Sequence, residues 1–462
     1  MDEAQAQPAG SYPGSLLCYE RARKVIPGGI HLSGRPLLEP QTSPMYFERA
    51  SGCRVWDVDG NQYIDYLMAF GAYLLGYAHP EVEEAAFRQA QRGRLISLNH
   101  PQHVAFIEAL LARFPGMEMG VFFKTGSEAT TAALRIARRH TRRRRVARCG
   151  YHGWHDWCLP LEDYVPDGLQ AQVLEFDANQ PATLQAIFTA HPGELAAVIL
   201  APEMVRPLQP AVFTELLRLT RQSGALFIMD EVKTGLRIRP NSVSERVGIV
   251  PDLMTVSKAL GNGFPVAALL GRREVMQAGA GMHYSATFHG DTAAMAAARK
   301  TMELCERDKV QQHVHALGER LIAGLSALAQ AHGLPAEAYG EPLPPMPFFR
   351  FTHESPQVNA RLVQGFYGEM LARGVLMHPR HMWFISLAHT PDDIDQTLAA
   401  ADRALARRTR EIGIYDVAEI ARCLQHCADS VVGIEKAEEI GPRVVPLGVE
   451  QIRRQGKAIT RR

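Results

Sequence analysis

The feature that most constrains this chain is an alternation of helical stretches and short apolar runs between residues 76 and 300. Helix-like segments such as "PEVEEAAFRQAQ" and "SEATTAALRIARRH" are separated by the runs "GVFFKT", "AAVILAP", "ALFIMDE" and "LMTVSK". Short runs that are apolar at consecutive positions are typical of strands buried on both faces. The alternation therefore predicts an α/β domain with a mostly parallel sheet flanked by helices.

The two flanks of this domain predict a smaller α+β lobe. The stretch "MYFERASGCRVWDVDGNQYIDYL" alternates around an Asp-Gly turn, which predicts a hairpin or meander. The later flank predicts helices with strands at "PFFRF" and "WFISLAH". We therefore expect five parts, namely a disordered N-terminus (1–15), an N-terminal segment of the small lobe (16–75), the large domain (76–300), a C-terminal small domain (301–410) and a helical tail (411–462).

Composition narrows the class of protein. The 462 residues are 46% hydrophobic, which is enough for a large core, and the net charge of +1 predicts no nucleic-acid or membrane partner. The basic run from Arg138 to Arg148 is the exception. It follows a helix-like segment, so we interpret it as a solvated helix end, with a phosphate or nucleic-acid patch as the alternative.

The cysteines indicate in which cellular compartment the protein is found. Seven cysteines are scattered along the chain, and only Cys423 and Cys427 lie close together. That pair lacks a second pair of ligands nearby, so no metal site is predicted. An odd, scattered set fits a reduced cytoplasmic location. The first residues show no signal pattern, and no apolar run is long enough to span a membrane.

Three of the predicted strands end in residues that suggest a ligand site, because ligands of open α/β sheets bind beyond the carboxyl ends of the strands. The strand before Gly126 and Ser127 leads directly into a helix, whose free amides and hydroxyls can bind an anion. The alternative is that Ser127 is an ordinary helix N-cap. Asp230 ends a second strand, where a carboxylate needs either a protonated heterocycle nitrogen or an arginine such as Arg237.

Lys258 ends the third strand, in "DLMTVSKALGNGFP". Partial burial lowers the pKa of a lysine, and an unprotonated amine is what Schiff-base chemistry needs. The alternative is a salt bridge to Asp230. Taken together, the three segments supply a phosphate cradle, a carboxylate for a ring nitrogen and an amine for an aldehyde. This inventory predicts pyridoxal 5'-phosphate as the cofactor.

The ordered motifs of the chain resemble those of the class III pyridoxal-phosphate aminotransferases of fold type I, and in particular the glutamate-1-semialdehyde 2,1-aminomutase-like branch. The resemblance covers roughly residues 20–405. Its motifs are "VWDVDGNQYIDY", "LLGYAHPEV", "KTGSEATTAALRIAR", "GYHGWHD", "GALFIMDEVKTGLRI", "PDLMTVSKALGNGFPVAALLGR", "ATFHGDTAAMAAA" and "SLAHTPDDID".

The resemblance implies roles for the residues around the cofactor. Lys258 would form the Schiff base and shuttle the proton, and Asp230 would keep the pyridine nitrogen protonated. Val232 would pack under the ring, and Tyr151 would stack on its other face, although Tyr151 alone would be interpreted as a core aromatic. Like Asp230 and Lys258, Tyr151 is predicted to be catalytic.

The resemblance also implies a shared site in a homodimer. Gly126 and Ser127 would bind the phosphate, and Thr287 would reach the phosphate of the partner subunit. Without the resemblance, Thr287 is only a loop hydroxyl. Arg35 falls on the arginine that receives the substrate carboxylate in amino-acid-using members, and its alternative is a surface arginine. Arg380 is the second predicted substrate-binding residue.

The function predicted from these residues is transamination between a carboxylate-bearing donor (an α-, D- or β-amino acid) and a keto acid or aldehyde. The chain departs from the aminomutases in a shorter stretch after "YHG" and in Arg380 and His381, where they carry an acidic pattern. Lys233 also replaces a usually uncharged residue. An aminomutase or racemase is the alternative, and a non-catalytic cofactor-binding protein or a nicotinamide enzyme is disfavoured.

Overall fold

The computed structural model describes most of the chain. The described ranges are residues 12–30, 38, 46–158, 167–340 and 343–408. The chain divides into two compact units, Met1–Ala406 and Arg407–Arg462.

Parts of the predicted termini lie outside the described residues. These parts are residues 1–11 and the whole predicted tail, 411–462. The predicted disordered N-terminus is too long, because helix α1 (Pro13–Ala22) already begins within it. Proline at the first helical position explains this start, since its fixed φ fits the helix and its missing N–H is not needed there.

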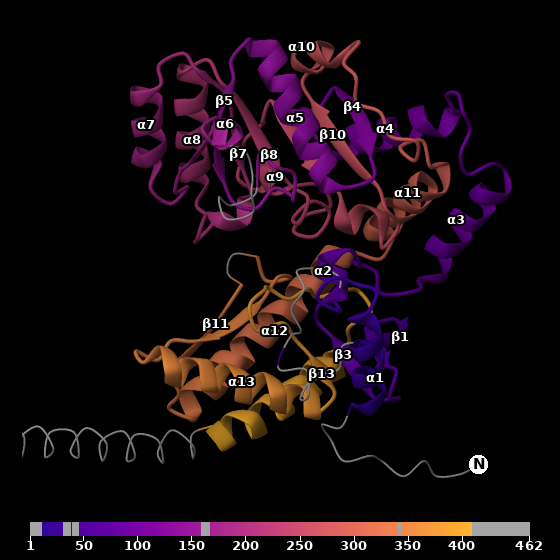
Figure 1. Ribbon diagram of the computed structural model, residues 1–462, viewed down its shortest axis with the longest axis vertical. Coiled ribbons are helices and arrows are strands. Elements are labelled where there is room, and N and C mark those ends of the chain that lie inside the picture. Colours follow the sequence, from indigo (N-terminus) through magenta and orange to yellow (C-terminus); the bar gives the residue numbers. More distant parts are fainter. Residues whose placement is uncertain (1–11, 31–37, 39–45, 159–166, 341–342, 409–462) are drawn as a thin grey trace, which may run out of the picture. The chain divides into compact units, whose positions relative to one another are not determined.

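A seven-stranded sheet forms the centre of the larger domain (Figure 1), in the order β4-β10-β9-β8-β7-β5-β6. Strand β10 runs antiparallel to both of its neighbours, and the other pairs are parallel. The predicted mostly parallel sheet is therefore confirmed. The bounds are β4 (Met119–Phe123), β5 (Arg145–Cys149), β6 (Val173–Glu175), β7 (Leu195–Leu200), β8 (Leu226–Asp230), β9 (Leu253–Val256) and β10 (Ala267–Gly271).

Helices cover both faces of this sheet, and each face has an apolar core. Within β8, Phe227 and Met229 belong to one core, while Ile228 belongs to the other. Successive residues of a strand point to opposite faces, which is why these strands are apolar at every position. Helix α8 (Pro210–Gln222) packs on β8 and contributes to the first core. Helix α5 (Gly126–Thr141) packs on β9 and β10 and contributes to the second.

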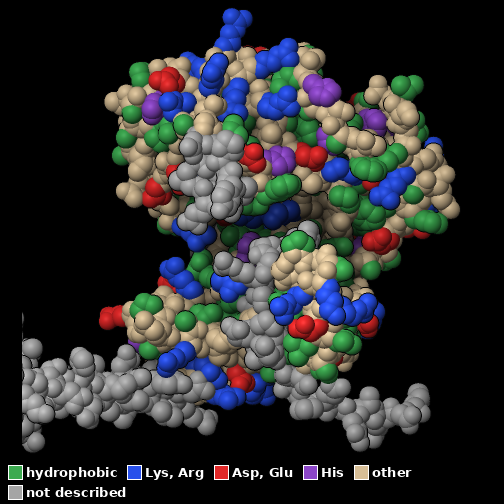
Figure 2. Space-filling model, in the orientation of Figure 1, with side chains coloured by type: hydrophobic (Ala, Val, Ile, Leu, Met, Phe, Trp, Pro, Cys, Tyr) green, Lys and Arg blue, Asp and Glu red, His purple; other side chains and the backbone are tan. Residues whose placement is uncertain are grey.

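The basic run begins in the last turn of α5, which ends at Thr141. Figure 2 shows Lys and Arg side chains gathered over this end of α5. Beyond the helix, Arg143 donates from Nη1 to the carbonyl oxygens of Leu195 (3.1 Å) and Ser223 (2.8 Å). Several of these arginines thus bind neighbouring carbonyl or carboxylate groups, which supports the interpretation as a solvated helix end.

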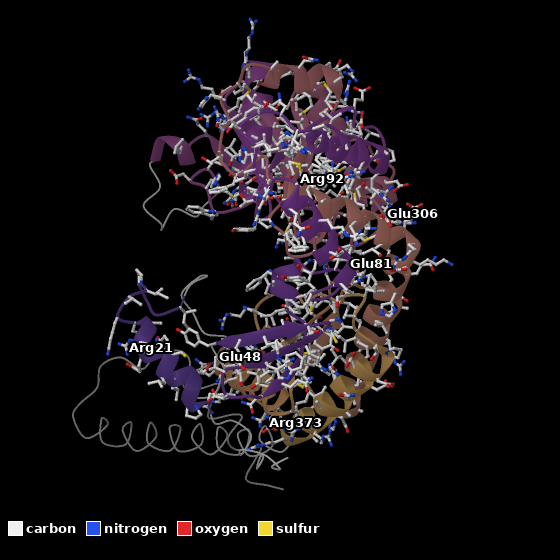
Figure 3. All side chains as sticks on the ribbon, turned by 90° about the vertical axis from the view of Figure 1, so that its right-hand side faces the viewer. Arg21, Glu48, Glu81, Arg92, Glu306 and Arg373 are labelled. Atoms are coloured by element: carbon white, nitrogen blue, oxygen red, sulfur yellow. The ribbon has the colours of Figure 1, made fainter. Side chains whose placement is uncertain are left out.

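Helix α11 (Thr292–Arg307) joins the large domain to the helices that precede the sheet. It packs against α3 (Pro80–Gln91) and α4 (Pro101–Arg113). Arg307 Nη1 and Nη2 bind the two carboxylate oxygens of Glu81 at 2.9 and 2.8 Å. Figure 3 shows Glu81 and Glu306 on the same side of the molecule. The pair is exposed, so it orients the helix ends more than it stabilises them.

The smaller lobe takes strands from both flanks of the chain. Strands β1 (Phe47–Ser51), β2 (Arg54–Asp57) and β3 (Gln62–Asp65) form an antiparallel meander, as predicted. Strand β13 (Val375–Leu376) pairs with β3 in parallel. The lobe therefore draws on both ends of the described chain, as the predicted fold class requires. The predicted domain boundaries within the unit remain predictions.

The predicted strand at "WFISLAH" is wrong. The segment is extended but belongs to no strand of the described residues. Trp383 N and Ile385 N donate to the carbonyl oxygens of Pro347 and Pro345, at 2.8 and 3.0 Å. Because proline has no N–H, these partners cannot return hydrogen bonds, so no two-way ladder forms. The predicted strand at "PFFRF" is confirmed as β12 (Phe348–Phe351), which pairs with β11 (Ala336–Tyr339).

The remaining helices complete the described fold. No helix among the described residues is both long and apolar enough to cross a bilayer. The remaining bounds are α2 (Met68–Gly71), α6 (Asp167–Gln170), α7 (Pro181–Ala190), η2 (Pro202–Met204), α9 (Val243–Arg246), η3 (Lys258–Gly261), α10 (Arg273–Met276), η4 (Gln277–Gly279), α12 (Val310–Ala331) and α13 (Pro356–Ala372).

Candidate active site

Lys258 lies just beyond the carboxyl end of β9 and begins the short helix η3. Its backbone φ is +45°, which is a costly conformation for a residue other than glycine. Its Nζ donates to the carbonyl oxygen of Phe70 at 3.0 Å, so the alternative of a salt bridge to Asp230 is wrong. Burial, helped by the nearby charge of Lys233, lowers the pKa of Lys258 to about 8.

The carbonyl that receives Lys258 belongs to a strained turn. Met68, Ala69 and Phe70 all have positive φ, between 45° and 56°. Left-handed residues of this kind cost about 1–2 kcal/mol each, and they persist only where the surroundings fix them. The buried guanidinium of Arg237 holds this turn by donating to the carbonyl oxygen of Gly71. The small lobe thus presents backbone acceptors to the end of the large-domain sheet.

Asp230 is the last residue of β8 and is 4% exposed. The Thr255 hydroxyl donates to its Oδ1 at 2.9 Å, and the Val232 N–H donates to the same oxygen at 3.1 Å. Its Oδ2 lies 2.7 Å from His152 Nδ1. Arg237, the alternative partner weighed from the sequence, binds elsewhere. Asp230 is therefore fixed by a histidine and by neutral donors, and it can face a protonated ring nitrogen without a competing arginine.

The start of α5 is free to bind an anion. Thr125, not Ser127, is the N-cap, and it forms a capping box with Glu128. The alternative that Ser127 is an ordinary cap is therefore wrong. Val232 lies close to the backbone of this helix end, because a Cβ added to Gly126 would lie 2.8 Å from Val232 Cγ1. A Cβ on Gly153 would lie 2.4 Å from Ser127 Oγ, so both positions form a narrow cradle.

These groups meet in one cavity of about 220 Å³, which we call the inner cavity. Its lining residues are Gly126, Ser127, Tyr151, His152, Gly153, Asp230, Val232, Lys233, Ser257 and Lys258. An amine, a buried carboxylate and a helix N-terminus therefore surround one space. The cradle at Gly126 and Gly153 and this donor set fit pyridoxal 5'-phosphate.

The structure does not bring all the predicted residues into the inner cavity. The cavity contains Gly126, Ser127, Tyr151, Asp230, Val232 and Lys258. Thr287 is exposed and does not line it. Arg35 lies outside the described residues. Arg380 is exposed and lines a second cavity instead.

The second cavity, which we call the outer cavity, has a volume of about 420 Å³. It shares Tyr151 and Lys233 with the inner cavity, and Tyr151 is 60% exposed. The other lining residues are Glu203, Val205, Arg206, Tyr339, Gly340, Leu343, Met346, Phe348, Arg380, His381 and Met382. Its walls are mainly apolar, with charged groups at a few places, which suits a substrate with an apolar body.

Sequence reasoning missed two parts of this site. It did not single out His152, although the residue lies in "YHG" beside Tyr151. It also gave no partner to Lys233, which forms an ion pair with Glu203. Glu203 follows β7 and Lys233 follows β8, and these neighbouring strands are parallel. Their carboxyl ends meet at the same edge of the sheet, and this signal could have found the pair.

Comparisons with known proteins agree with this geometry. The family model Aminotransferase class-III matches residues 38–389. A 3-aminobutyryl-CoA aminotransferase from Cloacimonas acidaminovorans is 34% identical over 402 residues, covering 85% of this chain and 96% of the relative. A glutamate-1-semialdehyde 2,1-aminomutase from Thermomicrobium roseum is 34% identical over 430 residues, covering 86% and 98%.

A solved structure has the same fold. The FumI protein of Sphingopyxis sp. MTA144, in its PLP internal aldimine form, superposes with a TM-score of 0.81 at 32% identity. The match covers 86% of this chain and 97% of that one. The central sheet, the smaller lobe and the site between them therefore have a counterpart of known structure.

Proposed function

This chain belongs to the class III aminotransferases, and we propose that it moves an amino group from a carboxylate-bearing donor to a keto acid or aldehyde. The donor would be an α-, D- or β-amino acid. The observation that carries the proposal is the inner cavity, where Lys258, Asp230 and the start of α5 line one space. The enzyme binds pyridoxal 5'-phosphate, as members of its family do.

Each residue of the inner cavity has a distinct role in the proposed reaction. When bound, pyridoxal 5'-phosphate supplies the aldehyde and the electron sink. Lys258 Nζ holds the cofactor and then carries the proton away from the donor carbon, because its lowered pKa keeps part of the amine unprotonated near neutral pH. Asp230 holds a proton on the ring nitrogen, and His152 and Thr255 orient it.

Other residues hold and cover the cofactor. The amides of Gly126 and Ser127, at the start of α5, bind its phosphate. Val232 and Tyr151 both line the inner cavity, where Val232 would pack against one face of the ring and Tyr151 would cover the other. Arg35 and Arg380 would bind a carboxylate of at least one of the two substrates. The cofactor would carry the amino group from the first substrate to the second, so the proposed reaction is ping-pong.

An aminomutase or racemase is the second candidate, since an aminomutase is among the relatives. The stretch after "YHG", which is short for an aminomutase, favours the transaminase, although residues 159–166 of it lie outside the described residues. An isomerase would convert an amine without any keto acid. Product formation that depends strictly on an added keto acid favours the transaminase.

The test is an absorbance titration of the purified enzyme with α-L-, α-D- and β-amino acids, diamines and amino sugars, without a keto acid. We expect one class to convert the cofactor band and to release a keto product. Lys258→Ala should lower turnover by at least about 1,000-fold, because it removes both the attachment and the proton carrier. The matched control is Lys300→Ala on α11, whose amine pairs with Glu303. Near-normal turnover of Lys258→Ala would overturn the assignment.

We also propose that the enzyme is a homodimer with shared sites and that it is cytoplasmic. Exposure of Thr287 outside the inner cavity supports the dimer, because a hydroxyl that serves the partner's site must face outward. The described cysteines, among them the buried Cys149, Cys158 and Cys305, are all free. Unpaired thiols support a reducing compartment.

A further inference from the structure

Lys233 lies at the boundary of the two cavities and is the only lysine among the described residues that lines both of them. It lies three positions after Asp230, the last residue of β8, so the end of the strand places it beside the cofactor space. Its side chain is 14% exposed. An ammonium so far removed from water requires a partner.

Glu203 is that partner. Its side chain is 3% exposed and forms an ion pair with Lys233 Nζ. Among the described residues, neither oxygen of Glu203 has any other donor. Because a buried carboxylate is costly without a counter-charge, Glu203 fixes where Lys233 Nζ lies.

The ammonium of Lys233 has more N–H groups than described acceptors. It carries three N–H groups, and within the described part of the chain its Nζ binds only Glu203. Lys233 and Lys258 also line the same inner cavity. The unused donors therefore lie where the reacting end of a substrate must pass.

The charges around the outer cavity favour an anion there. Glu203 is neutralised by Lys233, while the lining residues Arg206 and Arg380 are both exposed cations. Arg206 lies over the ring of Tyr339, at 5.4 Å from the centroid. Counted over its described residues, the lining has one ion pair and two further cationic side chains, and a net positive charge of this kind attracts a carboxylate and repels a second ammonium.

We propose that Lys233, fixed by Glu203, is the specificity-determining residue that receives the carboxylate of the amino substrate where the inner and outer cavities meet. The inference rests on the proposed transaminase function and names its substrate class as amino acids, rather than simple amines or diamines. A charge-assisted hydrogen bond in a mainly apolar site gives about a 10- to 100-fold preference. The apolar walls of the outer cavity then accept the side chain.

The experiment compares two donors that differ only in the carboxylate, namely 3-aminobutanoate and its decarboxylated analogue 2-aminopropane. Lys233→Met should lower kcat/KM for 3-aminobutanoate by about 10- to 100-fold, mainly through KM, because binding to the carboxylate is lost. Any effect of the lost charge on Lys258 acts on both donors alike, so the readout is the ratio of the two kcat/KM values, and this preference for 3-aminobutanoate over 2-aminopropane should fall by about 10-fold or more. Lys300→Met, which removes a lysine on α11 outside both cavities, should leave both values unchanged.

A double variant guards against misfolding, because Lys233→Met alone leaves Glu203 buried without a partner. Lys233→Met combined with Glu203→Gln removes both charges and should show the same loss of preference. Binding of 3-methylbutanoate, which has the carboxylate but no amine, provides a second readout by calorimetry. It should weaken about 10-fold or more in both Lys233 variants.

The outcomes separate the two proposals. If the wild-type enzyme releases no keto product from any donor, the proposed function fails, while binding of 3-methylbutanoate still tests Lys233. If the wild type transaminates and the double variant keeps its preference for 3-aminobutanoate, Lys233 does not receive the carboxylate. Equal losses with both donors would also overturn the inference, since they would indicate a structural role.

Discussion

A single buried amine, Lys258, combines three costs at one residue: burial, a positive φ and a neighbouring positive charge from Lys233. Burial and the neighbouring charge disfavour the protonated amine, and the positive φ strains the backbone. Its one described acceptor is a carbonyl oxygen, that of Phe70, which stabilises an ammonium less than a carboxylate would. The residue is therefore prepared for chemistry rather than for stability.

This preparation predicts how the stability of the cofactor-free protein depends on pH. The pKa of Lys258 is lowered from 10.5 to about 8, so the folded state binds fewer protons than the unfolded state between these values. The free energy of unfolding should therefore rise with pH across this window. The lowered pKa of Lys258 reduces the free energy of unfolding by about 3 kcal/mol below pH 8. This reduction disappears by about pH 10.5.

Denaturant unfolding of the cofactor-free wild type and of Lys258→Met, at several pH values from 7 to 11, measures the effect. Other groups titrate in the same range, so the informative quantity is the difference between the two proteins. Lys258→Met should be the more stable protein at low pH, and its advantage should shrink as the pH rises. A difference that does not vary with pH would contradict the lowered pKa.

At the scale of elements, the start of α5 links stability to cofactor binding. Thr125 caps the helix, with its Oγ1 accepting from the Glu128 N–H at 3.2 Å, while Glu128 binds the Thr125 N–H at 2.8 Å. Thr125→Ala should lower the free energy of unfolding by about 1 kcal/mol. It should also weaken binding of pyridoxal 5'-phosphate several-fold, because the amides that follow lose their fixed orientation.

Ser355→Ala is the matched control for Thr125→Ala. Ser355 caps α13 in the smaller lobe, with its Oγ accepting from the Val358 N–H at 3.4 Å. Its loss should cost similar stability and leave the affinity for the cofactor unchanged. Thermal unfolding and fluorescence titration with the cofactor measure the two quantities. An equal loss of affinity in both variants would show that general stability, not the helix start, controls binding.

The elements also show how far the sequence predicts this site. Asp230 and Lys258 were predictable, since each follows a short apolar run that could only be a buried strand. The pairing of Lys233 with Glu203 was not predicted, because it depends on which strands are neighbours and not on any local spacing. The segment from Trp383 was predicted as a strand from its apolar residues alone. Its partners are prolines, and that detail is invisible to a hydrophobic pattern.

At the scale of the whole molecule, the inner cavity contains most of the predicted cofactor site but not Thr287. Thr287 is exposed, and its neighbour Phe288 is 61% exposed. A phosphate-binding hydroxyl in this position serves either another copy of the chain or, from outside the inner cavity, its own chain. Subunit complementation distinguishes these two cases, because a site built from two chains can be restored by two different defective chains.

The prediction uses Lys258→Ala and Thr287→Asp, whose added charge would repel the phosphate. Each homodimer should be nearly inactive. A purified heterodimer of the two contains one site with both an intact Lys258 and an intact Thr287 from its partner, so it should regain about half of the wild-type activity per dimer.

The reciprocal control pairs a chain carrying both substitutions with a wild-type chain. If Thr287 acts across the interface, both sites of that dimer are damaged and it should be nearly inactive. If Thr287 served its own chain, the two results would be exchanged, and the shared site would be ruled out.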